Sequence, residues 1–247
     1  MTRVNRTQKV FSIDSNQKLG SSESGSKFSV KLDVPQRNAF NKASCLSCEL
    51  PKSFYLIDSS NDSFTLNEAT GGGDTTGNLP VGFYDVNTFI AALKTELDAT
   101  SSNGQTYTVT YSTTTGKITI VNGTNDFTLT LNESYQKYLG MASSVTSSSS
   151  SLTGSSTINL QHYDVLYVKC NQISNSNDNV LVELYPSSVA DKGIIKYTAP
   201  DGYLNSVSLT DNTSEIFQFT VEDKDNNVIQ LNGGHTRITM SCWNENL

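Results

Sequence analysis

Two of the four cysteines in this chain, Cys45 and Cys48, form a C-x-x-C pair. This spacing occurs in redox-active dithiols and in one half of a zinc site. A structural zinc site needs four ligands, and the sequence has no second cysteine pair and no nearby histidine to complete the set. The surrounding segment ASCLSCELP alternates like a strand, in which residues three apart point to opposite faces. We therefore expect buried free thiols, with a metal site or a disulfide as the alternative.

Two histidines and one acidic segment are the other residues that could do chemistry. His162 precedes a strand-like segment and His235 follows two glycines, so we expect both at strand ends or in loops rather than beside a nucleophile. The segment EDKDNN (222–227) has part of the spacing of a calcium loop, but it has a lysine inside it and suits a hairpin turn between two strands. We expect a turn, with a cation site as the alternative.

Known catalytic motifs are missing from the sequence. It contains no P-loop, dinucleotide-binding fingerprint, nucleophile elbow or zinc-binding helix. We therefore expect no enzymatic activity and no cofactor. A hydrolase that uses acids such as Glu133 is the remaining catalytic alternative.

The composition is typical of strands joined by polar turns. The 247 residues include 34 Ser, 28 Thr and 24 Asn, while charged residues make up only 17%. The 11 Tyr and 10 Phe supply core-forming side chains, so the chain is not of the disordered class. No apolar run approaches the length of a membrane helix, and the first residues lack the apolar stretch of a signal peptide. We expect a soluble protein without a membrane span.

The charge is distributed unevenly. A formal net charge of −7 argues against a nucleic-acid-binding surface on the body of the protein. The first ten residues are the exception, because they contain Arg3, Arg6 and Lys9 and no acid. Two interpretations stay open: a solvated tail, or an assembly arm that contacts neighbouring subunits or something anionic such as packaged genome.

Most apolar patterns in the chain have the period of two that is typical of strands. QKVFSI (8–13) could form a first strand, and Phe28 to Val34 alternate cleanly before Pro35. In the last third, the segment around Val165–Lys169 is apolar on both faces, which indicates a central strand. Further strands follow up to Trp243, and eight to ten strands are the number of a jelly roll or a similar sandwich.

Residues 79–141 form a different kind of unit, with one helix followed by three short strands. Asp85 is a good N-cap, and the helix is expected to end near Thr100. Four apolar residues recur on one helical face: Phe89, Ile90, Leu93 and Leu97. The strands centred on Val109, Ile118 and Leu129 predict a three-stranded antiparallel meander against the helix. The Ser-rich stretch at 142–157 is expected to be an exposed, flexible loop.

These segments resemble the penton (vertex) proteins of double-jelly-roll DNA viruses, especially those of virophages and polinton-like viruses. The resemblance covers roughly residues 25–247. The resembling stretches are LPVGFYDVNTFIAAL, YTVTYSTTTGKITI, NDFTLTLNESYQKYLGM, INLQHYDVLYVKCNQI and VIQLNGGHTRITMSCW. The Ser-rich loop departs from the family pattern, and its partner is not assigned.

The resemblance implies a mainly β fold: a single jelly-roll β-sandwich with an inserted small α+β domain, made of a helix and a three-stranded antiparallel sheet. We expect residues 1–25 to be an N-terminal arm and linker, 26–66 and 158–247 to form the jelly roll, and 67–157 to form the insertion. The implied function is a structural capsid protein, five copies of which form each vertex of an icosahedral shell.

The same resemblance implies the partners and the location. The partners would be four further copies in a homopentamer, the neighbouring major capsid protein, packaged genome at the arm, and a host receptor at the insertion. The protein would belong to the virion capsid and assemble in the cytoplasm or nucleus of the host cell. The alternative function is a receptor- or glycan-binding head of a capsid-associated protein.

Overall fold

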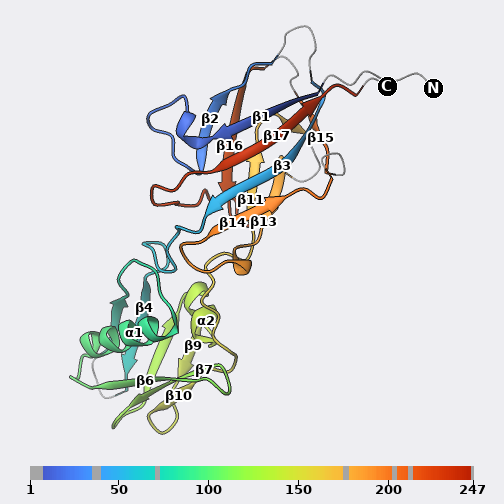
Figure 1. Ribbon diagram of the computed structural model, residues 1–247. Coiled ribbons are helices and arrows are strands. Elements are labelled where there is room, and N and C mark those ends of the chain that lie inside the picture. Colours follow the sequence, from blue (N-terminus) through green and yellow to red (C-terminus); the bar gives the residue numbers. More distant parts are fainter. Residues whose placement is uncertain are drawn as a thin grey trace. The chain divides into compact units, whose positions relative to one another are not determined.

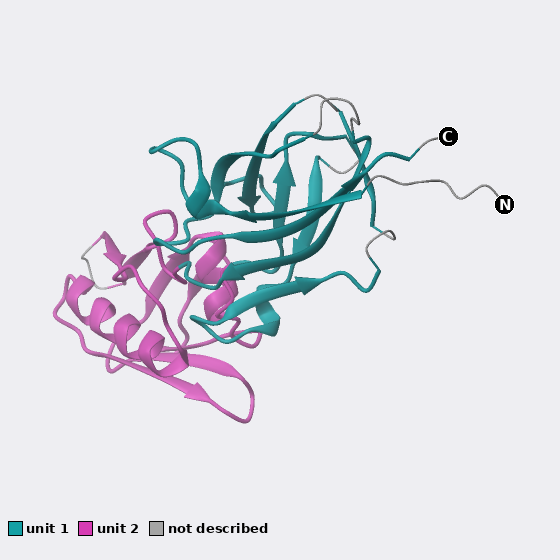
Figure 2. Ribbon diagram, turned by 45° about the horizontal axis from the view of Figure 1, so that its top comes forward, with its two compact units in different colours: residues 1–54, 163–247 teal, residues 55–162 magenta. Residues whose placement is uncertain are grey.

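The computed structural model describes residues 8–34, 40–69, 73–174, 178–201, 205–210 and 214–245. The chain divides into two compact units, drawn in different colours in Figure 2. Unit 1 comprises residues 1–54 and 163–247, and unit 2 comprises residues 55–162. Each unit has its own hydrophobic core. Unit 2 is therefore one continuous segment that lies, in the sequence, between the two segments of unit 1.

Unit 1 contains two antiparallel sheets. The first has the order β1-β17-β3-β15-β12, and β14 also pairs with β3. The bounds are β1 (Gln8–Asp14), β17 (Arg237–Trp243), β3 (Lys42–Pro51), β15 (Val207–Leu209), β12 (Ile173–Ser174) and β14 (Ile194–Thr198). The second has the order β13-β11-β16-β2. Its bounds are β13 (Val180–Leu184), β11 (Leu166–Cys170), β16 (Ile216–Glu222) and β2 (Lys27–Lys31).

Side chains from both sheets fill one core in unit 1. The period of two explains this core, since alternate residues of a strand point to one face. Phe217, Phe219 and Val221 of β16 are buried, and Phe219 stacks on Phe28 of β2 with ring centroids 5.5 Å apart. β11 lies between β13 and β16, which confirms the expected central strand.

The N-terminal segment differs from the expected arm and linker at 1–25. β1 pairs with β17 over its full length, from Gln8 opposite Trp243 to Asp14 opposite Arg237. Phe11 and Ile13 are buried because they alternate into the core of unit 1. A short 3₁₀ helix, η1 (Ser15–Gln17), follows. Residues 8–14 are thus an integral strand of the first sheet, as the pattern of QKVFSI allowed.

Unit 2 begins earlier than the expected insertion. β4 (Ser63–Glu68) pairs with β5 (Asp74–Asn78) and with β8 (Phe127–Leu131). Its apolar residues are buried in the core of unit 2, and residues 158 and 159 also bond backbone groups of unit 2. Residues 55–66 and 158–162 therefore belong to unit 2 and not to the jelly roll predicted for them. The prediction failed because a short strand pattern does not reveal which core the strand enters.

The expected helix is α1 (Val86–Thr100), with Asp85 as its N-cap. The Asp85 carboxylate accepts from the backbone N–H of Thr88, whose hydroxyl in turn accepts from the N–H of Asp85. This reciprocal pair satisfies two donors that an uncapped helix would leave free. Phe89, Leu93 and Leu97 are buried and Ile90 is half-buried, so the predicted face packs on the core.

The three predicted strands after α1 are present, but the prediction that they form one antiparallel meander is wrong. β6 (Tyr107–Ser112) pairs with β7 (Lys117–Asn122), whereas β8 pairs with β4 and joins a separate sheet. Unit 2 therefore has a three-stranded sheet, β10-β7-β6, and a four-stranded sheet, β5-β4-β8-β9. Residues 123–126, which connect β7 to β8, mark a change of sheet rather than a hairpin, because a local turn does not specify the next pairing partner.

The Ser-rich stretch is not a flexible loop throughout. It supplies β9 (Ser144–Thr146), which pairs with β8, and β10 (Ser151–Thr153), which pairs with β7. Leu152 is buried, and the buried Ser147 hydroxyl accepts from the N–H of Phe127. Serine-rich edge strands lack apolar alternation, which is why the pattern did not reveal them.

A second helix, α2 (Glu133–Leu139), was not expected. Asn132 caps its first turn by accepting from the N–H of Tyr135, and Gly140 ends it in a left-handed conformation with φ of 63°. A Cβ atom at Gly140 would lie only 2.3 Å from the carbonyl oxygen of Ser156. The position therefore requires glycine both for its φ and for the close approach of the following chain.

No helix within the described ranges is both long and apolar enough to cross a membrane.

Candidate functional site

Both cysteines of the C-x-x-C pair are buried, although strand alternation predicted opposite faces. The register of β17 on β3 shifts so that Thr239 lies opposite Ser47 and Met240 lies opposite Cys45. Leu46 is the extra residue of this bulge, which re-aims the chain and turns Cys45 and Cys48 into the same core. The expectation of opposite faces is wrong because it assumed a regular strand.

All four cysteines are free and buried, which confirms the main expectation. Burial raises the pKa of Cys45, Cys170 and Cys242 to about 12 in each case, and it raises the pKa of Cys48 well above its ordinary value. The thiolate is the nucleophile and the metal ligand, so thiols held protonated at neutral pH are inert. The described residues include no group of three or more His, Cys, Asp or Glu able to hold a metal ion.

His162 lies outside the helices and strands, shortly before β11, as expected, and it belongs to a polar cluster of unit 2. Its Nδ1 is 2.9 Å from the hydroxyl oxygen of Tyr138 and 3.2 Å from Nδ2 of Asn61, and its Nε2 is 3.7 Å from the Asp58 carboxylate. The order acid, histidine, hydroxyl is that of a catalytic triad, but Tyr138 is 1% exposed and cannot meet a substrate. The cluster instead links Asp58 and Asn61, near the start of unit 2, to His162 at its end.

The other residues with catalytic types are placed at the surface. His235 is exposed just before β17, and Glu133 is exposed in the first turn of α2, where a carboxylate favours the positive end of the helix dipole. Neither of these two side chains lies beside a nucleophile in the described contacts. The hydrolase alternative gains no supporting geometry.

The acidic segment 222–227 forms the expected turn. One Asp223 carboxylate oxygen accepts from the backbone N–H groups of Asp225 and Asn227, and Asn226 adopts a left-handed φ of 64°. Glu222 pairs with Lys169 at 2.9 Å. The carboxylates are thus used in turn geometry and ion pairing, which is the chemistry expected of a hairpin.

The three basic residues assigned to an assembly arm do not form one group. Lys9 lies in β1, where its Nζ is 2.7 Å from the Asp33 carboxylate and 5.3 Å from the centroid of the Phe11 ring. Lys9 is therefore part of the first sheet, and the prediction that it belongs to an assembly arm is wrong. Arg3 and Arg6 lie outside the described residues.

The two sheets of unit 1 leave free edges on opposite sides. β1 and β2 end the two sheets on one side, where Lys9 and Asp33 form an ion pair. The outer edge of β2 is covered in part, because the backbone N–H groups of Leu19 and Ser24 donate to the carbonyls of Ser29 and Lys27. On the other side, β12 ends the first sheet and β13 ends the second, and β14 pairs only with β3 among the described strands. Unpaired strand edges offer rows of backbone donors and acceptors to another chain. These edges are the surfaces of unit 1 best suited to assembly.

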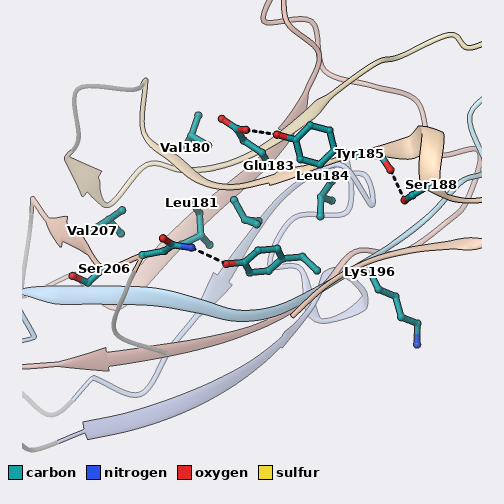
Figure 3. A pocket seen from close by; sticks show the side chains of 12 residues that line it. Val180, Leu181, Glu183, Leu184, Tyr185, Ser188, Lys196, Ser206 and Val207 are labelled. Carbon is teal, nitrogen blue, oxygen red and sulfur yellow. Dashed lines mark hydrogen bonds between the residues drawn. The ribbon is translucent and has the colours of Figure 1, made fainter. Parts of the chain in front are cut away.

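A groove runs along β13 on this second side (Figure 3). We call it the β13 groove; its volume is about 530 Å³, and it is lined by residues 180–185 and 205–207 together with Ser188, Lys196 and Tyr197. Sequence reasoning missed it because edge position depends on sheet order, which periodicity does not give. The exposed residues Glu183 and Tyr185, alternating with buried Leu184, were the only available signal.

Comparison with known proteins supports the fold. No family model matches the sequence, and no curated protein matches it. The crystal structure of the penton protein of mavirus is similar, with a TM-score of 0.55 and 10% sequence identity over 96% of this chain and 99% of that chain. The resemblance inferred from the sequence is thus confirmed at the level of the fold: this chain folds, over nearly its whole length, like the mavirus penton protein.

Proposed function

We propose that this chain is a structural capsid protein, five copies of which form each vertex of an icosahedral virion shell. The observation that carries the proposal is the fold likeness to a penton protein, which leaves out only 4% of this chain and 1% of the other. A likeness confined to one common sandwich would be weak support. Here both the sandwich and the interrupting unit are included, and that combination is far less general.

The strand order of unit 1 supports a single jelly roll. β1, β2 and β3 alternate between the sheets, β11 and β13 lie in the second sheet, β14 and β15 in the first, β16 in the second and β17 in the first (Figure 1). This sequence sets aside the two-residue β12, which lies between β11 and β13 and pairs in the first sheet, and it counts β14 and β15 as one strand because both pair with β3. An eight-stranded jelly roll, built from two Greek keys, has this alternation with one pair of consecutive strands in the same sheet. Unit 2 then occupies the connection between β3 and β11, and we assign it as the insertion domain.

The two open sides of unit 1 suit a ring. A closed five-fold ring needs a heterologous interface, in which one side of each copy meets the opposite side of the next. β1 would supply one side, since the edge of β2 is already covered in part, and β13 and β14 would supply the other. The neighbouring major capsid protein would contact the remaining surface, and unit 2 would face outward and offer a surface to a host receptor.

Native mass spectrometry of the full chain tests the proposal. The expected result is a species of five times the 26.9 kDa chain mass. Electron microscopy of particles assembled with the major capsid protein of the same virus should place this chain at the five-fold vertices. A chain that stays monomeric at every concentration and is missing from those vertices would overturn the proposal.

A further inference from the structure

The β13 groove exposes the edge of its strand rather than a face. Side chains of a strand alternate between faces, so a ligand lying on one face meets every second residue. The groove is instead lined by six consecutive residues, 180–185, which means that it follows the backbone edge of β13. Residues of β14 and β15 form the opposite wall. Such a site fits an extended chain.

An added strand is the mode of binding that this edge offers. β13 pairs only with β11 among the described strands, and its five residues contain no proline that would remove a donor. In β-strand addition, main-chain hydrogen bonds give affinity and side-chain pockets give selectivity. Pro186, at the start of the short 3₁₀ helix η2 (Pro186–Ser188), marks the end of the edge available for pairing.

The lining of the groove favours a basic segment. Lys196 is paired with Glu49 at 2.9 Å, so its charge is compensated. Glu183 is exposed, and its carboxylate accepts a hydrogen bond from the Tyr185 hydroxyl at 2.9 Å without a cationic partner among the described residues. One negative charge therefore remains in the groove, beside the 54% exposed ring of Tyr185.

Residues 1–7 of this chain have the complementary charge, since they contain Arg3 and Arg6 and no acid. These residues are too short to occupy the β13 groove of their own chain. Gln8, at the start of β1, is separated from Ser208 of β15 by β17 and β3, which is about 14 Å across three strand spacings. Seven extended residues span at most about 24 Å, so too little chain would remain to lie along β13.

We propose that the β13 groove receives residues 1–7 of a neighbouring copy as an additional strand on the edge of β13. This inference rests on the ring assembly proposed above, because a heterologous interface brings the β1 side of one copy to the β13 side of the next. Arg3 or Arg6 of one copy would then pair with Glu183 of the other.

Disulfide trapping between two variants, each with one introduced cysteine, tests the inference. Asn5→Cys and Ser188→Cys are purified separately, mixed and oxidised, and the four native thiols give little background because they are buried. The expected result is a covalent heterodimer on mixing, and a ladder of up to five chains for the double variant. Ser206→Cys, at the opposite wall of the groove, is the second acceptor. Lys224→Cys, in the exposed 222–227 turn, is the matched control that should not be trapped.

Native mass spectrometry of the same samples separates the outcomes. Pentamers without trapping at Ser188→Cys or Ser206→Cys would overturn this inference and leave the capsid proposal standing. Monomers without trapping would overturn both. Trapping only within one chain of the double variant would assign the groove to the chain's own arm, and trapping at Lys224→Cys alone would also overturn the inference.

Charge reversal tests the ion pair. Glu183→Lys should slow trapping at low salt by roughly twofold to fivefold, the range for one exposed ion pair. Adding Arg3→Glu and Arg6→Glu should restore the rate, and high salt should remove the difference. An unchanged rate for Glu183→Lys would exclude a role for this carboxylate, and a melting curve checks that the variant is folded.

Discussion

Unit 1 and unit 2 differ in the polar groups that they bury. Unit 1 buries four thiols and mostly small hydroxyl side chains, such as Ser26 and Thr236, whose O–H groups donate to backbone carbonyls. Unit 2 buries the Glu68 carboxylate, two Asn side chains and several Tyr rings. Among the described residues, the core of unit 1 therefore carries no ionisable group that is charged at neutral pH, whereas unit 2 buries one.

Glu68 shows what holds this charge in unit 2. Its carboxylate accepts from the hydroxyls of Ser101, Ser102 and Tyr107 and from the N–H of Asn103, at 2.8 to 3.1 Å. Burial alone would raise the pKa of Glu68, but these hydrogen bonds outweigh it and hold the pKa below its ordinary value. Burial and the Glu68 charge both raise the pKa of Tyr107. Among the described residues, unit 2 thus depends on a buried charge whose hydrogen bonds are satisfied, and unit 1 does not.

The largest expected loss of stability comes from removing a buried aromatic ring from the core of one unit. Phe219→Ala in unit 1 should cost about 3–5 kcal/mol of unfolding free energy, because a fully buried aromatic ring is lost. All four thiols belong to the core of unit 1, so their labelling reports the opening of that unit alone. Labelling by a thiol reagent should become much faster in this variant.

Phe127→Ala is the matched variant in unit 2, where Phe127 packs edge-on against Tyr107. It should lower the stability of unit 2 by a similar amount and leave the labelling rate unchanged. Equal acceleration of labelling by both variants would show that the two cores open together, and the comparison would then fail.

A smaller effect is expected at the end of α2. Gly140→Ala should destabilise unit 2 by roughly 2–4 kcal/mol, since it combines backbone strain with the overlap on Ser156. Gly123→Ala is the control, because a Cβ there meets no atom within 4 Å. Thermal unfolding followed by calorimetry measures both. A Gly140→Ala variant as stable as the control would mean that the chain after α2 can shift freely.

The smallest effect, and the sharpest test of the contrast, is Glu68→Gln. It should cost about 1–3 kcal/mol at neutral pH, because an amide cannot accept all four hydrogen bonds. The folded pKa of Glu68 is depressed, so the carboxylate's stabilisation is fully present above its unfolded value near 4.5 and is lost as pH falls through the folded value.

Melting temperatures of the wild type and Glu68→Gln, measured between pH 7 and pH 3, should therefore converge in acid. Glu215→Gln, which removes a surface partner of Lys31 in unit 1, is the control and should change little at any pH. A gap between wild type and Glu68→Gln that stays constant into acid would assign the loss to packing rather than charge.

The sequence predicted more of unit 1 than of unit 2, and the reason is physical. Strands such as β2 and β16 each carry a clean alternating pattern, and α1 has both a capping residue and a 3.6-residue period. In unit 2, β8 pairs with β4, which lies about 60 residues earlier in the chain. Periodicity identifies a strand but not its distant partner, so the meander was wrong. β9 and β10 have almost no apolar residues to mark them.

The candidate surfaces were even less visible in the sequence. The two cysteines share a face only because of the bulge at Leu46, and the β13 groove exists only because β13 ends its sheet. Both features depend on how distant strands align. The charge of residues 1–7 could be read directly, but the groove that we propose for them could not.

The polar cluster at His162 has a consequence for the order of folding. β3 and β11 are the strands of unit 1 that precede and follow unit 2 in the sequence. If the roughly 115 residues between them were unfolded, bringing these two strands into one sandwich would cost loop-closure entropy. Once unit 2 is folded, Asn61 and His162 lie 3.2 Å apart, so the intervening hundred residues no longer count as loop. The two halves of unit 1 then approach as if joined by short tethers. A folded unit 2 would therefore shorten the loop whose entropy opposes closure of unit 1.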